Sequence, residues 1–469
     1  YYAMDSWFVK MTAVKEMLLE FNSQVEWAPD WVGEGRFGEW LRNVKDWAIS
    51  RERYWGTPLP VWICGECGTQ HCVGSTEEMA KMAKDGSPVA QDLHRPYVDD
   101  TILVCPECNG DMKREPFVMD CWFDSGCASF AQWHHPFGEE GKFENNFPID
   151  YICEGVDQTR GWFYTLLAVS TTVFDSICYK RCLSLGLILD AEGKKMSKSK
   201  GNIVDPWDHF NREGADATRW YMVTAGAPWN PLKFDPNGVR ETYGKMFLTL
   251  WNVHRFHADY AALDGFDPHS SPTGKNTPLD NWVLSRLAEV VSDVTKQFEE
   301  WDFHKACRDI EEFVVNDVSN WYVRRSRRRL WDEADSDDKL ACQHTLHKVL
   351  VTVAKLMAPV SPFMSDTIHR NLEGVSVHLA DWPSAGPIDS QVIETMALVR
   401  ELAETGRRIR VDADRRQRLP CSEGWIVSGP DLSAFHEILA EELNVETISL
   451  EQDLDRFQKV EVIPNRRTL

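Results

Sequence analysis

Residues 194–202 read Lys-Lys-Met-Ser-Lys-Ser-Lys-Gly-Asn, with four lysines in the first seven positions. The apolar run of residues 185–189 precedes them, and the acidic, turn-like residues 190–193 lie between. This order predicts a strand, a turn and a basic loop. Closely spaced ammonium groups repel each other unless an anion lies among them. A polyphosphate suits that role, because lysines act as point charges while serine hydroxyls and backbone N–H groups donate hydrogen bonds. A solvated basic loop is the alternative.

The string Lys195-Met196-Ser197-Lys198-Ser199 resembles the signature loop of the class I aminoacyl-tRNA synthetases. In that family the loop closes on ATP and stabilises its phosphates while the aminoacyl adenylate forms. The resemblance implies that Lys195 and Lys198 are catalytic residues that act on the phosphates, and that Lys198 also takes part in ATP binding. It further implies ATP, together with Mg²⁺, as a substrate.

A second informative stretch lies upstream, where residues 151–164 read Tyr-Ile-Cys-Glu-Gly-Val-Asp-Gln-Thr-Arg-Gly-Trp-Phe-Tyr. The pattern predicts an apolar strand, a glycine turn carrying acids and amides, and a helix that continues to Phe174. Such a unit places polar side chains at the carboxyl edge of a parallel sheet, where nucleotides bind. The carboxylates there can hold ribose hydroxyls or an ammonium group, and Gly155 allows the backbone to approach an adenine ring. For any one residue, a capping or turn role is the stronger alternative.

The run Gln158-x-Arg160-Gly161-Trp162-Phe163 makes this segment resemble the adenylate-binding segment of the isoleucyl-tRNA synthetases. Residues 49–62 resemble the string that those enzymes carry after their editing insertion. The resemblance implies a set of site residues: Glu154 for the aminoacyl adenylate, Gly155 and Asp157 for adenosine, Gln158 beside the amino-acid end, and Trp122 and Trp162 as apolar walls for the isoleucine side chain. A valyl or leucyl enzyme is the nearest rival, and residues 158–163 argue against it.

Two C-x-x-C knuckles lie in one segment of the chain, Cys64/Cys67 and Cys105/Cys108. Together they supply four thiolate ligands, which suits a tetrahedral zinc ion. A helix-like insertion over residues 76–84 separates them, and nearby His71 and Cys72 are alternative ligands. The pattern predicts a structural zinc, because a closed four-cysteine site has no open position for catalysis. Free thiols are the alternative.

Beyond residue 278 the apolar residues recur with helical spacing, which predicts at least three amphipathic helices in a bundle. Pro359 and Pro362 are expected to end the third. The second helix ends in a cluster of arginines among aromatic residues, Arg324, Arg325, Arg327, Arg328 and Arg329. Such a cluster suits phosphate contacts and base stacking, and the bundle resembles the anticodon-binding domain of class Ia synthetases. The alternative is that Asp332, Glu333 and Asp335 neutralise the arginines.

The expected fold is the carboxyl-terminal half of an α/β Rossmann-like catalytic core with a zinc-ribbon-like insertion, followed by an all-α anticodon-binding bundle and a small mixed α/β tail. The expected boundaries run in chain order: the end of the editing insertion at 1–40, the catalytic portion at 41–205 with the zinc insertion at 60–115, a tRNA stem-contact region and linker at 206–275, the bundle at 276–388, and the tail at 389–469.

Composition narrows the class of protein. The formal net charge of −22 disfavours indiscriminate nucleic-acid binding, although a basic patch on an acidic body remains compatible with it. No apolar run approaches the ~20 residues of a membrane helix, so no membrane partner is expected. Thirteen cysteines without a secretory signal indicate a reducing compartment, and we expect a cytoplasmic monomer.

The resemblance implies a parent reaction in which L-isoleucine and ATP form the adenylate and the isoleucyl group passes to tRNA(Ile). The family also needs a His-x-Gly-His segment near its amino terminus, and no such string occurs in this sequence. His254-Arg255-Phe256-His257 has the spacing but lacks the glycine. Since the chain begins at Tyr1, we expect a fragment, and since it lacks the histidine segment, we expect that fragment to be inactive alone. The editing insertion is absent too. A non-catalytic tRNA-binding protein is the rival from another class.

Overall fold

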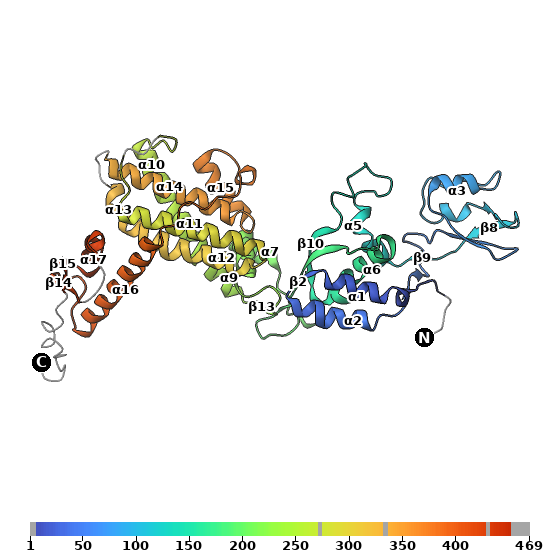
Figure 1. The fold of residues 1–469 in the computed structure, drawn as a ribbon, viewed down its shortest axis with the longest axis horizontal. Helices are drawn as coiled ribbons and strands as arrows, with labels where there is room; N and C mark the ends of the chain where they lie inside the picture. The colour runs from blue at the N-terminus through green and yellow to red at the C-terminus, as the bar shows by residue number, and fades with distance from the viewer. Residues whose placement is uncertain (1–5, 271–273, 332–335, 428–431, 452–469) are drawn as a thin grey trace. The chain divides into compact units, whose positions relative to one another are not determined.

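The computed structural model describes residues 6–270, 274–331, 336–427 and 432–451. The chain divides into two compact units, shown in Figure 1. The first comprises Tyr1–Leu189 with Pro228–Leu232, and the second comprises Asp190–Ala227 with Lys233–Leu469. Among the described residues, none of the helices is both long and apolar enough to cross a membrane.

The first unit is built on a parallel sheet with the order β10 (Ile149–Gly155), β11 (Tyr179–Leu185) and β2 (Glu26–Ala28). Helix α6 (Trp162–Phe174) connects β10 to β11, as a parallel pair requires. Helices α1 (Lys15–Ser23) and α2 (Gly38–Arg42) supply Leu18 and Leu41 to the same core as Phe163. The strand–turn–helix predicted over residues 151–174 is therefore present, and β10 ends at its acidic turn.

Residues around the two C-x-x-C knuckles form a separate antiparallel sheet with the order β6 (Gln70–Cys72), β5 (Val61–Cys64), β8 (Asp111–Arg114) and β7 (Leu103–Val104). The predicted insertion helix is α3 (Thr76–Met82), which Ser75 caps by accepting a hydrogen bond from the Glu78 N–H. Trp62, Met79 and Leu103 form a small core of their own. This subdomain thus combines a modest apolar core with the cysteine cluster.

Several short elements complete the first unit, and some of them position the site described below. Short strand pairs join β1 (Phe8–Val9) to β3 (Trp47–Ala48) and β4 (Ser50–Arg51) to β9 (Val118–Met119). The remaining helical segments are η1 (Met11–Ala13), η2 (Val32–Phe37), η3 (Tyr97–Asp100), α4 (Cys121–Gly126), α5 (Ala128–Ala131) and η4 (Val156–Arg160).

The second unit opens with the lysine segment and a group of helices. Just before the lysine segment, β12 (Ile188–Leu189) of the first unit pairs with β13 (Leu232–Lys233), which begins in that unit. The predicted strand over residues 185–189 is split between β11 and β12. The helices that follow are η5 (Lys198–Lys200), α7 (Pro206–Arg212), α8 (Ala215–Thr224), α9 (Pro236–Thr242), η6 (Tyr243–Phe247) and α10 (Leu248–Asp264). Trp220 of α8 is buried in the same core as the bundle helices, so these helices are continuous with the bundle.

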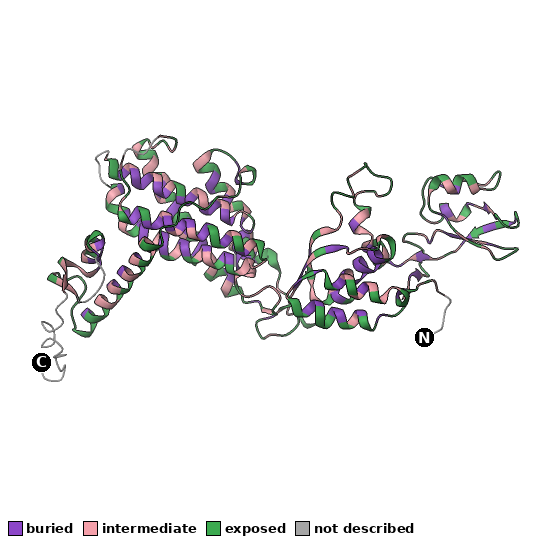
Figure 2. Cartoon of the chain, in the orientation of Figure 1, coloured by how far each residue is buried: buried purple, intermediate pink, exposed green. Residues whose placement is uncertain are grey.

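The bundle confirms the helices that the apolar spacing predicts. They are α11 (Pro278–Glu299), α12 (Phe303–Glu312), α14 (Asp337–Met357) and α15 (Pro362–Glu373). Thr277 and Asp280 form a reciprocal capping box at the start of α11, and α15 begins at Pro362, where a missing N–H costs little. Figure 2 shows the buried stripes along these helices.

One part of the bundle differs from a regular helix. Between α12 and α13 (Arg324–Trp331) the chain forms wide π-type turns, η7 (Phe313–Val323). An ordinary helical stripe would bury residues three or four apart, whereas Trp321, Tyr322 and Val323 are all buried here. Tyr322 donates a hydrogen bond of 2.6 Å to Asp280, which explains why a polar ring end is accepted in this core.

The tail follows the short η8 (Val377–Leu379) and begins with the long helix α16 (Ser390–Asp412). Strands β14 (Cys421–Val427) and β15 (Val445–Glu451) pair in parallel, joined through η9 (Ser433–Phe435) and α17 (His436–Leu443). Met396 of α16 and Leu439 of α17 belong to the core of the bundle. Residues 452–469 of the expected tail domain and residues 1–5 of the first expected domain lie outside the described part of the chain.

Candidate functional site

The turn that follows β10 is organised by Gln158. Its side-chain oxygen accepts a hydrogen bond of 2.9 Å from the Trp162 N–H, which caps the start of α6, and its amide nitrogen donates to Asp157 at 3.3 Å. Glu154 and Asp157 are both exposed at the end of the strand. A strand end, a helix start and two exposed carboxylates therefore meet at one edge of the parallel sheet.

Glycine at position 161 allows two of the predicted site residues to lie close together. A Cβ atom at Gly161 would lie 2.4 Å from the Gln158 side-chain oxygen and 3.2 Å from the Trp122 ring. Trp162 donates from its indole nitrogen to the Ser125 carbonyl at 3.0 Å, which ties α6 to α4. The structure thus brings Trp122, Gln158 and Trp162 together as two indoles beside an amide.

Supporting residues that the sequence analysis did not select hold this arrangement in place. Arg36 donates to the buried Thr159 hydroxyl at 3.0 Å, across a separation of 123 positions. Buried Asp120 accepts from the Trp122 N–H at 3.2 Å and pairs with Arg51 at 2.6 Å. Asp120 stands in a recognisable helix-capping position before α4, but no sequence signal connects Arg36 to this turn.

The lysine segment lies in the second unit, and its four lysine side chains are exposed. The described residues contain no ion pair to Lys194, Lys195, Lys198 or Lys200. Asp190 accepts from the Lys194 N–H at 2.6 Å and from the Asn202 amide at 2.7 Å, and these hydrogen bonds lower the pKa of the Asp190 carboxyl. The loop therefore presents ammonium groups that no described carboxylate neutralises, and hydrogen bonds to Asp190 hold its two ends together.

The four predicted zinc ligands converge. The sulfur atoms of Cys64, Cys67, Cys105 and Cys108 all lie within 4.8 Å of one another. The Cys64–Cys108 and Cys67–Cys105 sulfurs are 3.5 and 3.6 Å apart. Zinc–sulfur bonds of ~2.3 Å place tetrahedral sulfurs about 3.8 Å apart, so the cluster fits that ion. Of the two alternative ligands, His71 pairs with Glu78 at 2.9 Å, and Cys72 lies outside the cluster.

One thiol of this cluster ionises more readily than the usual cysteine. The hydroxyl and backbone N–H of Thr69 stabilise the thiolate of Cys67 and lower its pKa to about 6. Cys64 and Cys105 are buried at the inner side of the cluster. A metal ion requires thiolates as ligands, and the Thr69 contacts favour that form of Cys67.

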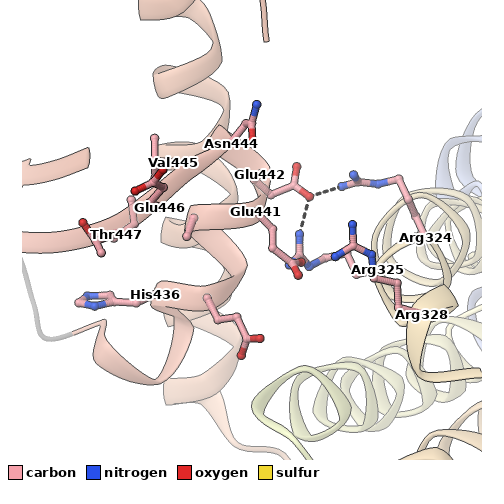
Figure 3. Close-up of a pocket in the computed structure, with 13 residues that line it drawn as sticks. Arg324, Arg325, Arg328, His436, Glu441, Glu442, Asn444, Val445, Glu446 and Thr447 are labelled. Atoms are coloured by element: carbon pink, nitrogen blue, oxygen red, sulfur yellow. Dashed lines mark hydrogen bonds and ion pairs between the residues drawn. The ribbon is translucent and has the colours of Figure 1, made fainter. Parts of the chain in front are cut away.

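The arginine cluster divides into two groups. Glu442, which is almost fully buried, accepts from Arg324 at 2.6 Å, from Arg325 at 2.5 Å and from Arg407 at 2.7 Å. Figure 3 shows Glu442 in contact with the first two of these arginines. The three side chains are part of the lining of a groove of about 780 Å³. The guanidiniums of Arg324 and Arg325 thereby hold α17 against the bundle.

Arg329 is also engaged, through both oxygens of the buried Asp280 at 2.8 Å and through Asp338 at 2.8 Å. By contrast, Arg327 and Arg328 are exposed, and the described part of the chain offers them no ion pair. The predicted neutralising residues Asp332, Glu333 and Asp335 lie outside the described residues. Among the described residues, these two of the five predicted arginines therefore lack a carboxylate partner.

Comparison with known proteins shows which family this chain resembles. Residues 1–231 match the model of class I tRNA synthetases (I, L, M and V), and residues 280–423 match the anticodon-binding domain of tRNA ligases. The isoleucine–tRNA ligase of Clostridium novyi (strain NT) is 44% identical over 99% of this chain. The chain belongs to the class I aminoacyl-tRNA synthetases. The isoleucine–tRNA ligase of Thermus thermophilus is 43% identical over 100% of it.

The chain spans only 46% of the length of each of these two synthetases. Two solved synthetases share its fold: the LeuRS of Agrobacterium radiobacter K84 in a ternary complex with tRNA and LeuAMS, and the Mycobacterium tuberculosis methionyl-tRNA synthetase with methionyl-adenylate. Each has a TM-score of 0.58, at 21% and 18% identity. The likenesses cover 75% and 82% of this chain, and 43% and 68% of those chains.

Proposed function

We propose that this chain is the part of an isoleucine–tRNA ligase that carries the adenylate-binding half of the active site and the anticodon-binding half of the tRNA interface. The observation that carries the proposal is the turn after β10, where Gln158 joins Asp157 to the start of α6 beside Trp122 and Trp162. The parallel order of β10, β11 and β2 supports a Rossmann-like core, with the turn at the carboxyl edge of its strands.

The roles of the individual residues follow from their chemistry. Isoleucine attacks the α-phosphate of ATP through its carboxylate, a step that depends on positioning and on stabilising charge. Glu154 and Asp157 present carboxylates that can hold the ammonium and ribose hydroxyls, and Gly155 leaves room for adenine. Lys195 and Lys198 present positive charge for the phosphates. Mg²⁺ enters with ATP and offsets the charge of the phosphates.

The amino-acid pocket is tested by binding of non-hydrolysable aminoacyl-adenylate analogues, measured by calorimetry. We expect the isoleucyl analogue to bind more tightly than the valyl and leucyl analogues. A hydrophobic pocket separates side chains that differ by one methylene by about 10- to 200-fold, isoleucine and valine being the standard example. Trp162→Ala should weaken the isoleucyl analogue more than adenosine monophosphate, because only the former reaches the indoles.

A matched control is Trp207→Ala, which removes an exposed tryptophan of α7 that lies outside the proposed pocket. Preference for the valyl or leucyl analogue would assign the chain to another member of the family. Failure of all three analogues to bind, with tRNA binding intact, would support a non-catalytic tRNA-binding protein.

We further propose that the four cysteines hold one structural Zn²⁺. Their donor set and sulfur spacing support this ion, and a bound zinc would cross-link the two knuckles. The proposed nucleic-acid partner is tRNA(Ile). Arg327 and Arg328 are its proposed phosphate contacts in the bundle, while contact through Arg324, Arg325 and Arg329 stays a prediction that requires a phosphate to replace a carboxylate partner. We also propose the domain boundaries given in the sequence analysis, a monomeric state and a cytoplasmic location.

A further inference from the structure

The lysine segment is closed by a pair of side chains that have no assigned role. Asp190 precedes the loop and Asn202 ends it, and the Asn202 amide donates to the Asp190 carboxylate at 2.7 Å. The other Asp190 oxygen accepts from the Lys194 N–H at 2.6 Å. The contact therefore joins the two ends of a loop of thirteen residues, 190–202.

Asn202 also holds the middle of the loop. Its side-chain oxygen accepts from the Ser197 N–H at 2.9 Å, and its nitrogen also donates to the Lys195 carbonyl at 3.3 Å. An amide is the short side chain that can donate to a carboxylate and accept from an N–H at the same time. Aspartate at this position could only accept, and a hydroxyl is too short to span both partners.

These contacts bear on the lysines, because Lys194, Lys195 and Lys198 lie inside the ring that they close. Their like charges repel one another, and among the described residues none of them has an ion-pair partner. Fixing the backbone before a ligand arrives reduces the ordering cost of binding. We propose that Asp190 and Asn202 are positioning residues that hold the lysine loop ready for a polyphosphate. This inference rests on the proposed role of the lysines in binding ATP phosphates.

The experiment exchanges the two side chains. In Asp190→Asn, two amides meet, and at least one of the four hydrogen bonds must fail. In Asn202→Asp, two carboxylates face each other. The double variant Asp190→Asn/Asn202→Asp rebuilds three of the four hydrogen bonds: Asn at 190 accepts from Lys194 N–H and donates to Asp at 202, which accepts from Ser197 N–H. It loses only the longest one, the donation to the Lys195 carbonyl. It also keeps the net charge of the parent chain.

The probe is inorganic tripolyphosphate binding to the full chain, measured by calorimetry at fixed ionic strength. A hydrogen bond to a charged group changes an equilibrium constant by about tenfold, so each single variant should bind about tenfold more weakly. Simple charge arithmetic predicts the opposite for Asp190→Asn, because that variant is more positive. The double variant should recover most of the parent's affinity for tripolyphosphate. Hydrogen exchange of the Ser197 amide should also be slower in the double variant than in either single variant.

The outcomes separate the inference from the function on which it rests. If Lys195→Ala/Lys198→Ala binds tripolyphosphate as the parent does, the lysines are not a phosphate site and both proposals fail. If that variant loses affinity while Asp190→Asn binds as tightly as the parent or more tightly, only the inference fails. A double variant that is no better than the single variants would also overturn it.

Discussion

At the scale of single residues, His257 carries the clearest pH dependence. It is almost fully buried on α10, with His347 at 5.7 Å between ring centroids and no partner for its Nδ1 atom among the described residues. Burial, aided by the neighbouring His347 and His254, lowers the pKa of His257 to about 3. The native bundle therefore holds a neutral imidazole here.

The sign of the effect follows from the lowered pKa. The unfolded chain takes up a proton on this residue below pH 6.5, whereas the native chain does so only near pH 3. Stability from the neutral ring is complete above pH 6.5 and is lost as the pH falls, by about 2 kcal/mol at pH 5. Urea unfolding between pH 7 and pH 5 measures this loss.

His257→Gln should flatten the pH dependence of unfolding, because glutamine does not titrate. The remaining slope would come from buried His254, whose pKa burial also lowers, and from His344, whose pKa is lowered mainly by burial. His269→Gln serves as the control, since His269 is exposed. An unchanged slope in His257→Gln would contradict the assignment.

Residue-level prediction from sequence succeeded where a motif identifies its own partners. The four cysteines of the two knuckles converge as expected, although 38 and 44 positions separate the sulfurs that lie 3.6 and 3.5 Å apart. It failed where partners share no motif or periodic pattern. Arg36 reaches Thr159 from 123 positions away, and the contact between Asp190 and Asn202 depends on loop geometry that spacing alone does not determine.

At the scale of elements, we expect the β5–β8 subdomain to depend on the proposed zinc ion. Its core is small, with Trp62, Met79 and Leu103 among its buried residues, so a metal cross-link should supply much of its stability. We expect about one zinc per chain in purified protein. Mutation of a residue that only hydrogen-bonds to a metal ligand lowers metal affinity by about 10- to 100-fold. Cys64→Ser removes a ligand itself and should lower zinc affinity by more than that.

The measurement is metal analysis combined with amide exchange of residues 61–114. Zinc removal by a chelator should accelerate exchange there and leave α11 protected. Cys72→Ser is the matched control, because that exposed cysteine lies outside the cluster. The prediction would be wrong if the purified protein contained no zinc while all its cysteines were reduced and this segment showed normal protection from exchange.

Elements were predictable where apolar periodicity is regular, as for α11 and α14. The π-type turns of η7 were not, because the spacing of apolar residues does not reveal whether each N–H bonds to the carbonyl four or five residues back. The strand expected at 185–189 is split because Gly186 passes close to the Asn230 carbonyl, where a Cβ atom would lie at 2.2 Å. That approach depends on a segment more than forty positions away.

At the scale of the whole molecule, an acidic chain must present local positive charge to bind tRNA. The net charge is −22, and Glu442 already forms ion pairs with Arg324, Arg325 and Arg407. Such a buried carboxylate with three guanidiniums holds the tail to the bundle, and removing one member would leave uncompensated charge. The proposed tRNA contacts therefore fall on Arg327 and Arg328, which are exposed on α13.

The most direct test of tRNA binding by this chain is a salt titration of its affinity for tRNA(Ile). Arg327→Ala/Arg328→Ala should weaken binding and lower the salt slope by about two units, one for each phosphate that an arginine no longer neutralises. Arg327→Lys/Arg328→Lys is the matched control, and it should keep the slope because it keeps the charge. Unchanged melting of both variants, with a reduced slope only in the alanine variant, is the predicted result. Equal slopes and affinities in the parent and the alanine variant would contradict the account.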